Sequence, residues 1–235
     1  MKKTGDNIKA ENANWKFNGE MVENFQKHIE KSVPLYKEGH KLIENLSDYF
    51  IKNDSTCYEL GSSIGTLLYN ISKKHSLRSA KFIGLEIEKD MVKKANKLYK
   101  NPNLSFICDD INHTKLEKSD LIISYYTMQF IHPKHRQTLF NKIYESLHWG
   151  GAFILFEKVR ANDARFQDIL TALYTDYKLD KGYSPDEIVA KTKSLKGVLE
   201  PFSTKGNLDL LKRAGFVDVI TIQKYMNFEG FLAIK

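Results

Sequence analysis

The segment YELGSSIG at residues 58–65 decides the fold, because it leads from a strand into a helix within a few residues. The residues before it, 55–58, are β-prone, and apolar side chains follow at helical spacing over residues 66–71. Gly61 and Gly65 tolerate a positive φ, or allow a ligand to lie against bare backbone. A loop that opens a helix also presents unpaired N–H groups, which can hold a carboxylate. The segment therefore predicts a strand, a ligand-binding loop and a helix.

A second predicted strand, at residues 81–86, ends in an acid just over twenty residues after the loop. An acid at the carboxyl end of the second strand of a βαβ unit is placed to accept hydrogen bonds from both hydroxyls of a ribose. A strand–glycine–helix turn alone is weak support for a cofactor site, and a loop acid is commonly a solvated surface residue. Because the two features occur together, we favour ribose binding by Glu86.

The rest of the chain alternates strands and helices with short polar connections. Further elements are predicted as strands at 104–108, 121–126 and 152–156, helices at 90–99 and 134–148, and closing strands at 217–222 and 231–234. Apolar strands separated by helices predict a parallel sheet covered on both faces. The last two strands are joined by a short loop, which predicts an antiparallel hairpin at the sheet edge. The fold class is therefore α/β, a Rossmann-like, mostly parallel seven-stranded sheet with an antiparallel C-terminal hairpin and helical additions.

Two regions are predicted around this sheet. Residues 1–52 form an N-terminal helical cap, with helices at 20–31 and 42–50 and with about the first 14 residues flexible. Residues 53–235 form the Rossmann-like domain and carry a helical insertion at 161–199. We expect this insertion to supply substrate specificity or a dimer contact.

Composition limits the classes of function. The 235 residues include 36 Lys and Arg against 29 Asp and Glu, but no basic run is interleaved with aromatic residues, so direct nucleic-acid binding is not indicated. No apolar run approaches the ~20 residues of a membrane span, and the polar start lacks a signal core. Cys57 and Cys108 have no C-x-x-C partner and are expected to be buried in strands. We therefore expect a cytoplasmic protein without membrane contact.

Several segments resemble the carboxy-S-adenosylmethionine synthase family within the class I S-adenosylmethionine-dependent methyltransferases. They are KSVPLY at 31–36, TMQFI at 127–131, GGAFILFEK at 150–158, GYS at 182–184 and NFEGFLAIK at 227–235. The likeness runs from about residue 15 to the end of the sequence. It implies S-adenosylmethionine as the cofactor, S-adenosylhomocysteine as its demethylated form, or carboxy-S-adenosylmethionine in the synthase reaction.

The same resemblance implies a set of cofactor-binding residues. They are Tyr36, Glu59, Gly61, Ser62, Ser63, Glu86, Ile87, Asp110, Ile111 and Tyr125. The loop backbone and Tyr36 would surround the methionine part, since an aromatic ring attracts a sulfonium cation. Glu86 with Ile87 would hold the ribose. A carboxylate such as Asp110 suits the amino edge of adenine, and an apolar neighbour such as Ile111 suits the ring face.

Three positions depart from the family pattern. At the position of Tyr125 the family has an asparagine, at that of Thr192 an arginine supplied by the partner subunit, and at that of Glu59 an aspartate. We expect the change from aspartate to glutamate to be tolerated. The arginine guanidinium binds the carboxylate of the family product through two hydrogen bonds, which a threonine hydroxyl cannot form. The nearby lysines that offer a point charge instead are Lys191, Lys193 and Lys196. The bulk of the Tyr125 side chain is expected to narrow the space next to the sulfonium sulfur of S-adenosylmethionine.

These departures lead to three hypotheses. The first is an S-adenosylmethionine-dependent methyltransferase that acts on a small molecule and has lost the carboxylate clamp. The second is the family activity, which converts S-adenosylmethionine and prephenate to carboxy-S-adenosylmethionine for wobble-uridine modification of tRNA. The third is a cofactor-binding protein without turnover.

No catalytic residue is assigned and no metal site is expected. The polar groups at or just beyond strand ends are Tyr125, Tyr126, His132 and Glu157, and spacing singles out none of them as a base. The resemblance also implies a homodimer built partly from the insertion at 161–199.

Overall fold

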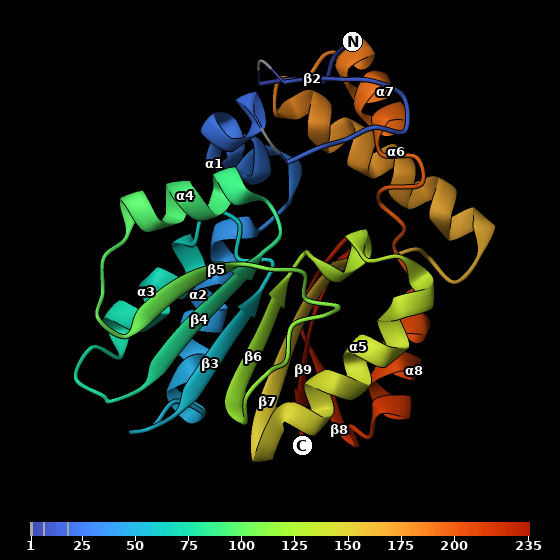
Figure 1. Cartoon of the computed structure of the whole chain (residues 1–235). Coiled ribbons are helices and arrows are strands. Elements are labelled where there is room, and N and C mark those ends of the chain that lie inside the picture. Colours follow the sequence, from blue (N-terminus) through green and yellow to red (C-terminus); the bar gives the residue numbers. More distant parts are fainter. Residues whose placement is uncertain (1, 7, 18) are drawn as a thin grey trace.

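The protein is described by a computed structural model over residues 2–6, 8–17 and 19–235 (Figure 1). Its centre is a seven-stranded sheet in the order β5-β4-β3-β6-β7-β9-β8. The strands are β3 (Thr56–Leu60), β4 (Lys81–Glu86), β5 (Leu104–Cys108), β6 (Ser119–Tyr125), β7 (Leu147–Lys158), β8 (Asp218–Tyr225) and β9 (Phe228–Ile234). Within this sheet β9 runs antiparallel to both neighbours, and the other paired strands are parallel. The predicted fold class and C-terminal hairpin are confirmed.

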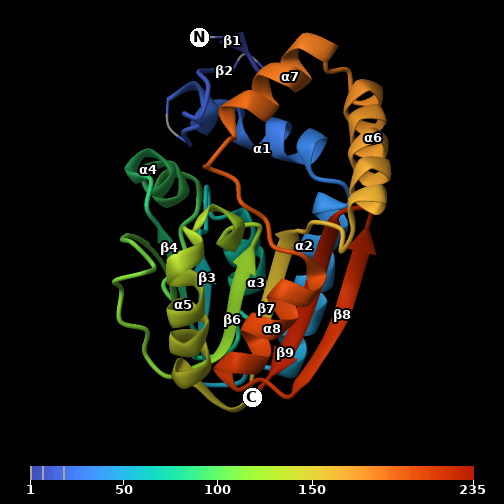
Figure 2. The same ribbon diagram turned by 90° about the vertical axis from the view of Figure 1, so that its right-hand side faces the viewer.

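Helices cover both faces of the sheet, as the two views in Figures 1 and 2 show. The helices are α1 (Glu20–Ser32), α2 (Tyr36–Leu46), α3 (Thr66–Lys74), α4 (Lys89–Leu98), α5 (Pro133–Ser146), α6 (Ala164–Asp180), α7 (Pro185–Ser194) and α8 (Thr204–Ala214), with short 3-10 turns η1 (Ser47–Tyr49) and η2 (Met128–Phe130). One apolar core lies between the sheet and α2, α3 and α4. The other lies between the sheet and α5 and α8. Among the described residues, no helix combines the length and apolar character needed to cross a bilayer.

The strand, loop and helix predicted at residues 58–65 are confirmed. Gly61 and Gly65 have φ values of +76° and +81°, a region in which glycine meets no steric penalty. A side chain at Gly61 would collide with Thr127, so the backbone there passes close to the end of β6. The amides of Gly61 and Ser62 both donate to the Leu85 carbonyl, at 2.8 and 3.0 Å. The loop is therefore attached to the end of β4 by its own main chain.

The start of α2 differs from the sequence prediction, which began this helix at residue 42. Val33 is extended, as expected for a residue before proline, and Leu35 has a φ of 55°. The chain becomes helical again directly after these residues, so α2 begins at Tyr36. This places the buried Tyr36 ring in the first turn of the helix, close to the end of β6.

The two cysteines have different environments. Cys57 lies in the central strand β3 and is buried, as predicted. Cys108 is exposed, so the prediction that it is buried was wrong. It ends β5, the strand at one edge of the sheet, which has a strand neighbour on one side only.

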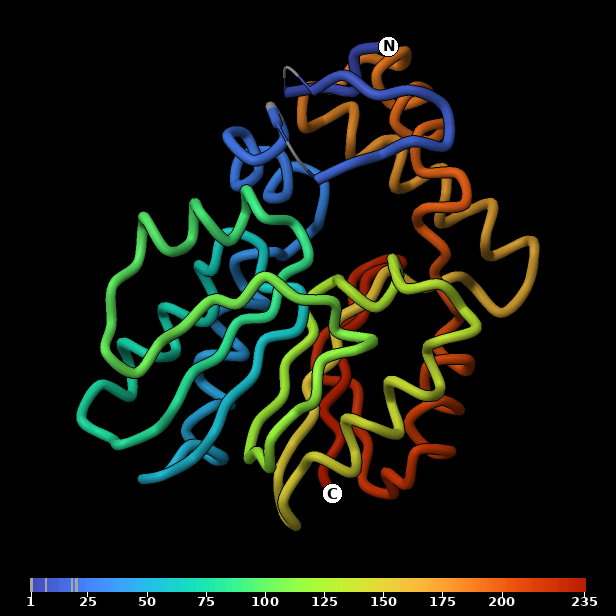
Figure 3. The backbone as a smooth tube through the Cα atoms, viewed as in Figure 1, coloured from blue at the N-terminus to red at the C-terminus, as the bar shows by residue number. Residues whose placement is uncertain are grey.

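The N-terminal segment packs beside the helical insertion, as the backbone trace in Figure 3 shows. The short strands β1 (Lys2–Lys3) and β2 (Lys9–Ala10) pair with each other. The amides of Ala13 and Trp15 donate to carbonyls at the end of α7, at 3.0 and 3.1 Å. The division into 1–52 and 53–235 and the flexibility of the first 14 or so residues stay predictions. Met1 and Asn7 of that segment lie outside the described residues.

Candidate functional site

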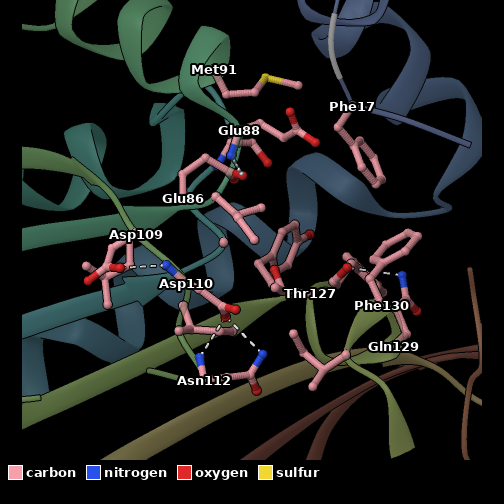
Figure 4. Close-up of a pocket in the computed structure, with 18 of the residues that line it drawn as sticks. Phe17, Glu86, Glu88, Met91, Asp109, Asp110, Asn112, Thr127, Gln129 and Phe130 are labelled. Atoms are coloured by element: carbon pink, nitrogen blue, oxygen red, sulfur yellow. Dashed lines mark hydrogen bonds between the residues drawn. The ribbon is translucent and has the colours of Figure 1, made fainter. Parts of the chain in front are cut away.

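A cavity of about 350 Å³ lies at the carboxyl ends of β3, β4, β5 and β6 (Figure 4). Ligands of open α/β sheets bind at this edge, where the strand order reverses, and here it reverses between β3 and β6. The volume falls within the ~300–1,000 Å³ typical of small-molecule sites. Eight of the ten predicted residues line the cavity: Tyr36, Gly61, Ser63, Glu86, Ile87, Asp110, Ile111 and Tyr125.

The Glu86 carboxylate is fixed by two backbone amides. The Ser63 amide donates to Oε2 at 2.8 Å, and the Glu88 amide donates to Oε1 at 3.0 Å. Burial raises the pKa of Glu86, and these amides oppose that shift. Each carboxylate oxygen has a further lone pair for a hydroxyl group. The side chain therefore points its acceptors at the cavity, as two ribose hydroxyls require.

A second carboxylate lies at the end of β5. Asp110 Oδ1 accepts hydrogen bonds from the amide and the Nδ2 group of Asn112, both at 2.9 Å (Figure 4). Its Oδ2 lies 3.8 Å from His113 and can accept a hydrogen bond from an amino group. Two isoleucines accompany it: Ile111 is buried, whereas Ile87 is 63% exposed although it lines the cavity. A carboxylate acceptor beside apolar side chains suits a planar nucleobase that carries an amino group, such as adenine.

Three tyrosines form the part of the cavity near β6. The Tyr125 hydroxyl donates to the Tyr36 carbonyl at 2.6 Å, and their ring centroids are 5.1 Å apart. The Tyr125 hydroxyl occupies the position that a side chain at Gly39 would take. Burial raises the pKa of Tyr125 and Tyr126, so both phenols keep their protons at neutral pH. These rings offer aromatic surface for a cation rather than a general base.

Two predicted residues, Glu59 and Ser62, lie behind the loop and do not line this cavity. They border a small void of about 20 Å³ together with His40. Glu59 Oε2 accepts a hydrogen bond from the Leu68 amide at 3.2 Å, and burial raises its pKa to about 8. The Gly61 and Ser62 amides are engaged by Leu85, so the loop contributes a close backbone surface rather than three free donors.

The sequence did not identify the aromatic side chains that cover the cavity. Phe17, from the N-terminal segment, packs edge-to-face on Phe130 of η2, with ring centroids 5.0 Å apart (Figure 4). Phe130 belongs to a segment quoted for the resemblance, but nothing in its spacing predicts contact with a residue more than a hundred positions away. Together the two rings form part of the cavity wall.

Thr192 lies outside this cavity. It is exposed on α7, and its hydroxyl donates to the Ile188 carbonyl of its own helix at 2.9 Å. It lines a second cavity of about 530 Å³, which Lys191 and Lys196 also line but Lys193 does not. Across the described residues, no group of three or more His, Cys, Asp or Glu side chains could hold a metal ion.

The fold is that of the class I S-adenosylmethionine-dependent methyltransferases, and the cavity lies at the sheet edge where this fold binds ligands. The methyltransferase domain family matches residues 58–151. A crystal structure of an S-adenosylmethionine-dependent methyltransferase from Methanococcus maripaludis superposes with a TM-score of 0.61, at 20% identity, over 97% of each chain. Human N-acetylserotonin methyltransferase in complex with S-adenosylmethionine gives a TM-score of 0.60 at 17% identity, covering 92% of this chain and 55% of that one.

The curated relatives identify the family. The carboxy-S-adenosyl-L-methionine synthase of Staphylococcus epidermidis is 36% identical over 222 residues, covering 94% of this chain and 97% of the relative. That of Desulfotalea psychrophila is 35% identical over 225 residues, covering 94% and 92%. The chain belongs to the carboxy-S-adenosyl-L-methionine synthase family. It is an S-adenosylmethionine-dependent transferase, as predicted, with S-adenosylmethionine as its cofactor or substrate. The free acceptors of Glu86 and the buried, unpartnered Tyr126 hydroxyl fit such a ligand.

Glu86→Ala is expected to weaken S-adenosylmethionine binding about tenfold or more, because it removes the carboxylate that we expect to accept hydrogen bonds from the ribose. Isothermal titration calorimetry measures the affinity. Asp90→Ala is the matched control, since Asp90 is an exposed acid at the start of α4 outside the cavity. An unchanged affinity in Glu86→Ala would contradict the ribose assignment.

Glu59→Gln is expected to gain stability relative to the wild type as the pH rises. Because burial raises the pKa of Glu59 to about 8 in the folded chain, from an ordinary value of 4.5, the folded state binds the proton more tightly than the unfolded state does. Wild-type stability therefore falls as the pH rises from 4.5 to 8, by at most about 1.4 kcal/mol per pH unit, and glutamine removes this loss. Urea unfolding of both proteins at pH 5, 6, 7 and 8 checks this. If the difference in unfolding free energy between Glu59→Gln and the wild type does not change with pH, the raised pKa of Glu59 is contradicted.

Proposed function

We propose that the chain carries out the reaction for which its relatives are named, the carboxylation of the sulfonium methyl of S-adenosylmethionine. One methyl C–H bond breaks, a C–C bond forms to CO₂ released by the second substrate, and the proton is taken up by the group which that substrate loses. The observation that carries the proposal is the second cavity beside the first. The two share the side chains of Phe17, Ile29, Gln129 and Phe130, so a second substrate has a place next to the cofactor. In the family resemblance that substrate is prephenate, and the product serves wobble-uridine modification of tRNA.

The side chains of the first cavity contribute binding, orientation and exclusion of water. Glu86 holds the ribose and Asp110 the adenine edge, which fixes the nucleoside along the sheet edge. Tyr36 and Tyr125 lie where the sulfonium would sit, and their faces stabilise its charge. When bound, S-adenosylmethionine supplies a methyl carbon activated by the sulfonium. The Phe17 and Phe130 pair keeps water away from that carbon.

A second candidate is methyl transfer to a small acceptor. It is favoured by Tyr125 and Thr192, where the family has asparagine and arginine. The Thr192 hydroxyl is hydrogen-bonded within its own helix, so it offers no two-point contact to a carboxylate. Under this candidate the cofactor site is the same, and the second cavity takes the methyl acceptor. A cofactor-binding protein without turnover is the third candidate.

The proposal includes a cytoplasmic homodimer. Support comes from α6 in the insertion, whose exposed apolar side chains include Phe166 and Ile169, at 59% and 47% exposure. An exposed apolar helix face of this kind commonly marks a protein contact. A monomer in multi-angle light scattering at micromolar concentration would contradict this part of the proposal.

Incubation of the purified protein with S-adenosylmethionine and prephenate is expected to yield a product heavier than S-adenosylmethionine by the mass of CO₂, detected by mass spectrometry. Thr192→Arg is the informative variant. If the wild type forms no such product and Thr192→Arg does, the wild type has lost the family reaction and methyl transfer is favoured. If neither forms it while S-adenosylmethionine binds, the proposed reaction is wrong.

A further inference from the structure

The ammonium group of Lys142 binds three backbone carbonyls of a single turn. Lys142 lies on α5, and the turn follows β5 and carries Asp110 and Ile111, which line the first cavity. The Lys142 Nζ group donates to the carbonyls of Ile111, Asn112 and Thr114, the last two at 3.2 and 2.9 Å. A lysine ammonium has three donor hydrogens. Carbonyls of the turn can therefore engage all of them.

This contact fixes the turn to a helix that is distant from it in sequence. The hydrogen bonds inside the turn are short-range: Asp110 Oδ1 accepts from the amide and Nδ2 of Asn112 (Figure 4), and the Asp110 carbonyl accepts from the His113 and Thr114 amides, each at 2.9 Å. Such bonds set the shape of the turn but not its position. In Figure 1 the loop that follows β5 passes beside α5, which packs into one of the two apolar cores. Lys142 therefore connects the turn to a rigid element.

The electrostatic surroundings of Lys142 agree with this role. Burial lowers its pKa, and the negative charges of Asp110 and Asp109 oppose that shift. Carbonyl acceptors also favour the protonated ammonium over the neutral amine. Lys142 does not line the first cavity, so any effect on a ligand there must pass through the turn.

We propose that Lys142 is a positioning residue for the nucleobase of the cofactor, and that the preference of the site for a base with an amino group depends on it. The inference rests on the proposed function, which places adenine beside Asp110. The Asp110 carboxylate can accept a hydrogen bond from the amino group only if the turn holds it at the cavity. Without the ammonium, three carbonyls lose a common donor, and the turn that carries Asp110 and Ile111 is free to shift.

The test compares two ligands by isothermal titration calorimetry on the full chain. One is S-adenosylhomocysteine, and the other is its analogue with hypoxanthine, in which an oxo group replaces the amino group of adenine. The wild type is expected to bind the adenine ligand about tenfold more tightly or better, because a carboxylate facing an oxo group brings two acceptors together. In Lys142→Met, which keeps an unbranched side chain and removes the ammonium, this ratio is expected to fall to about threefold or less.

The ratio separates positioning from a merely structural role. A general loss of stability would weaken both ligands together and leave their ratio unchanged. Lys118→Met is the matched control, since the exposed Lys118 donates to the Glu145 carbonyl of α5 at 2.7 Å and does not line the first cavity. It should keep the wild-type ratio. Glu86→Ala should weaken both ligands by similar factors, because Glu86 is assigned to the ribose and not to the base.

Two results would overturn the inference. One is a wild-type protein that does not distinguish the two bases, and the other is a wild-type ratio in Lys142→Met. If Lys142→Met does not fold, Lys142→Gln carries the same expectation, because its shorter, neutral amide cannot reach all three carbonyls. The proposed function fails separately: if base preference depends on Lys142 while no carboxylated product forms, the positioning role holds and the reaction does not.

Discussion

The hydrogen bond from the Ser63 amide to the Glu86 carboxylate, 2.8 Å long, joins the carboxyl ends of β3 and β4. The Leu85 carbonyl strengthens this connection, because it accepts from both Gly61 and Ser62. Such close contact between two strand ends requires the positive φ of Gly61. The carboxylate is consequently fixed at the edge where the strand order reverses, and the position of the first cavity follows from it.

The two cavities keep opposite charges apart. Acidic side chains line the sheet edge, whereas the lysines of the second cavity lie beyond the wall that includes Phe17 and Phe130. If Lys158 or Lys178 lay beside Glu86, they would form ion pairs with it, and neither site would have charge available for a ligand. Separation by these apolar rings keeps Glu86 from forming an ion pair with Lys158 or Lys178. The raised pKa of Glu86 and the lowered pKa of Lys178 both reflect this, since burial is the leading cause of each.

Local pattern allowed most of the fold and the first cavity to be predicted. The strand, glycine loop and helix are adjacent in sequence, and the end of a parallel strand places Glu86 without knowledge of the other strands. Cys108 was misplaced because its exposure depends on β5 being an edge strand, which is set by strand order. The second cavity could not be predicted, because Lys158, Lys178 and Lys191 are brought together by packing, and each lysine alone has the pattern of a solvated side chain.

A crystal structure of the chain with S-adenosylmethionine tests the central claim most directly. The account predicts the ribose hydroxyls within hydrogen-bonding distance of both Glu86 carboxylate oxygens, with the adenine against Ile87 and Ile111. A nucleoside bound elsewhere, or bound here without contact to Glu86, would contradict it.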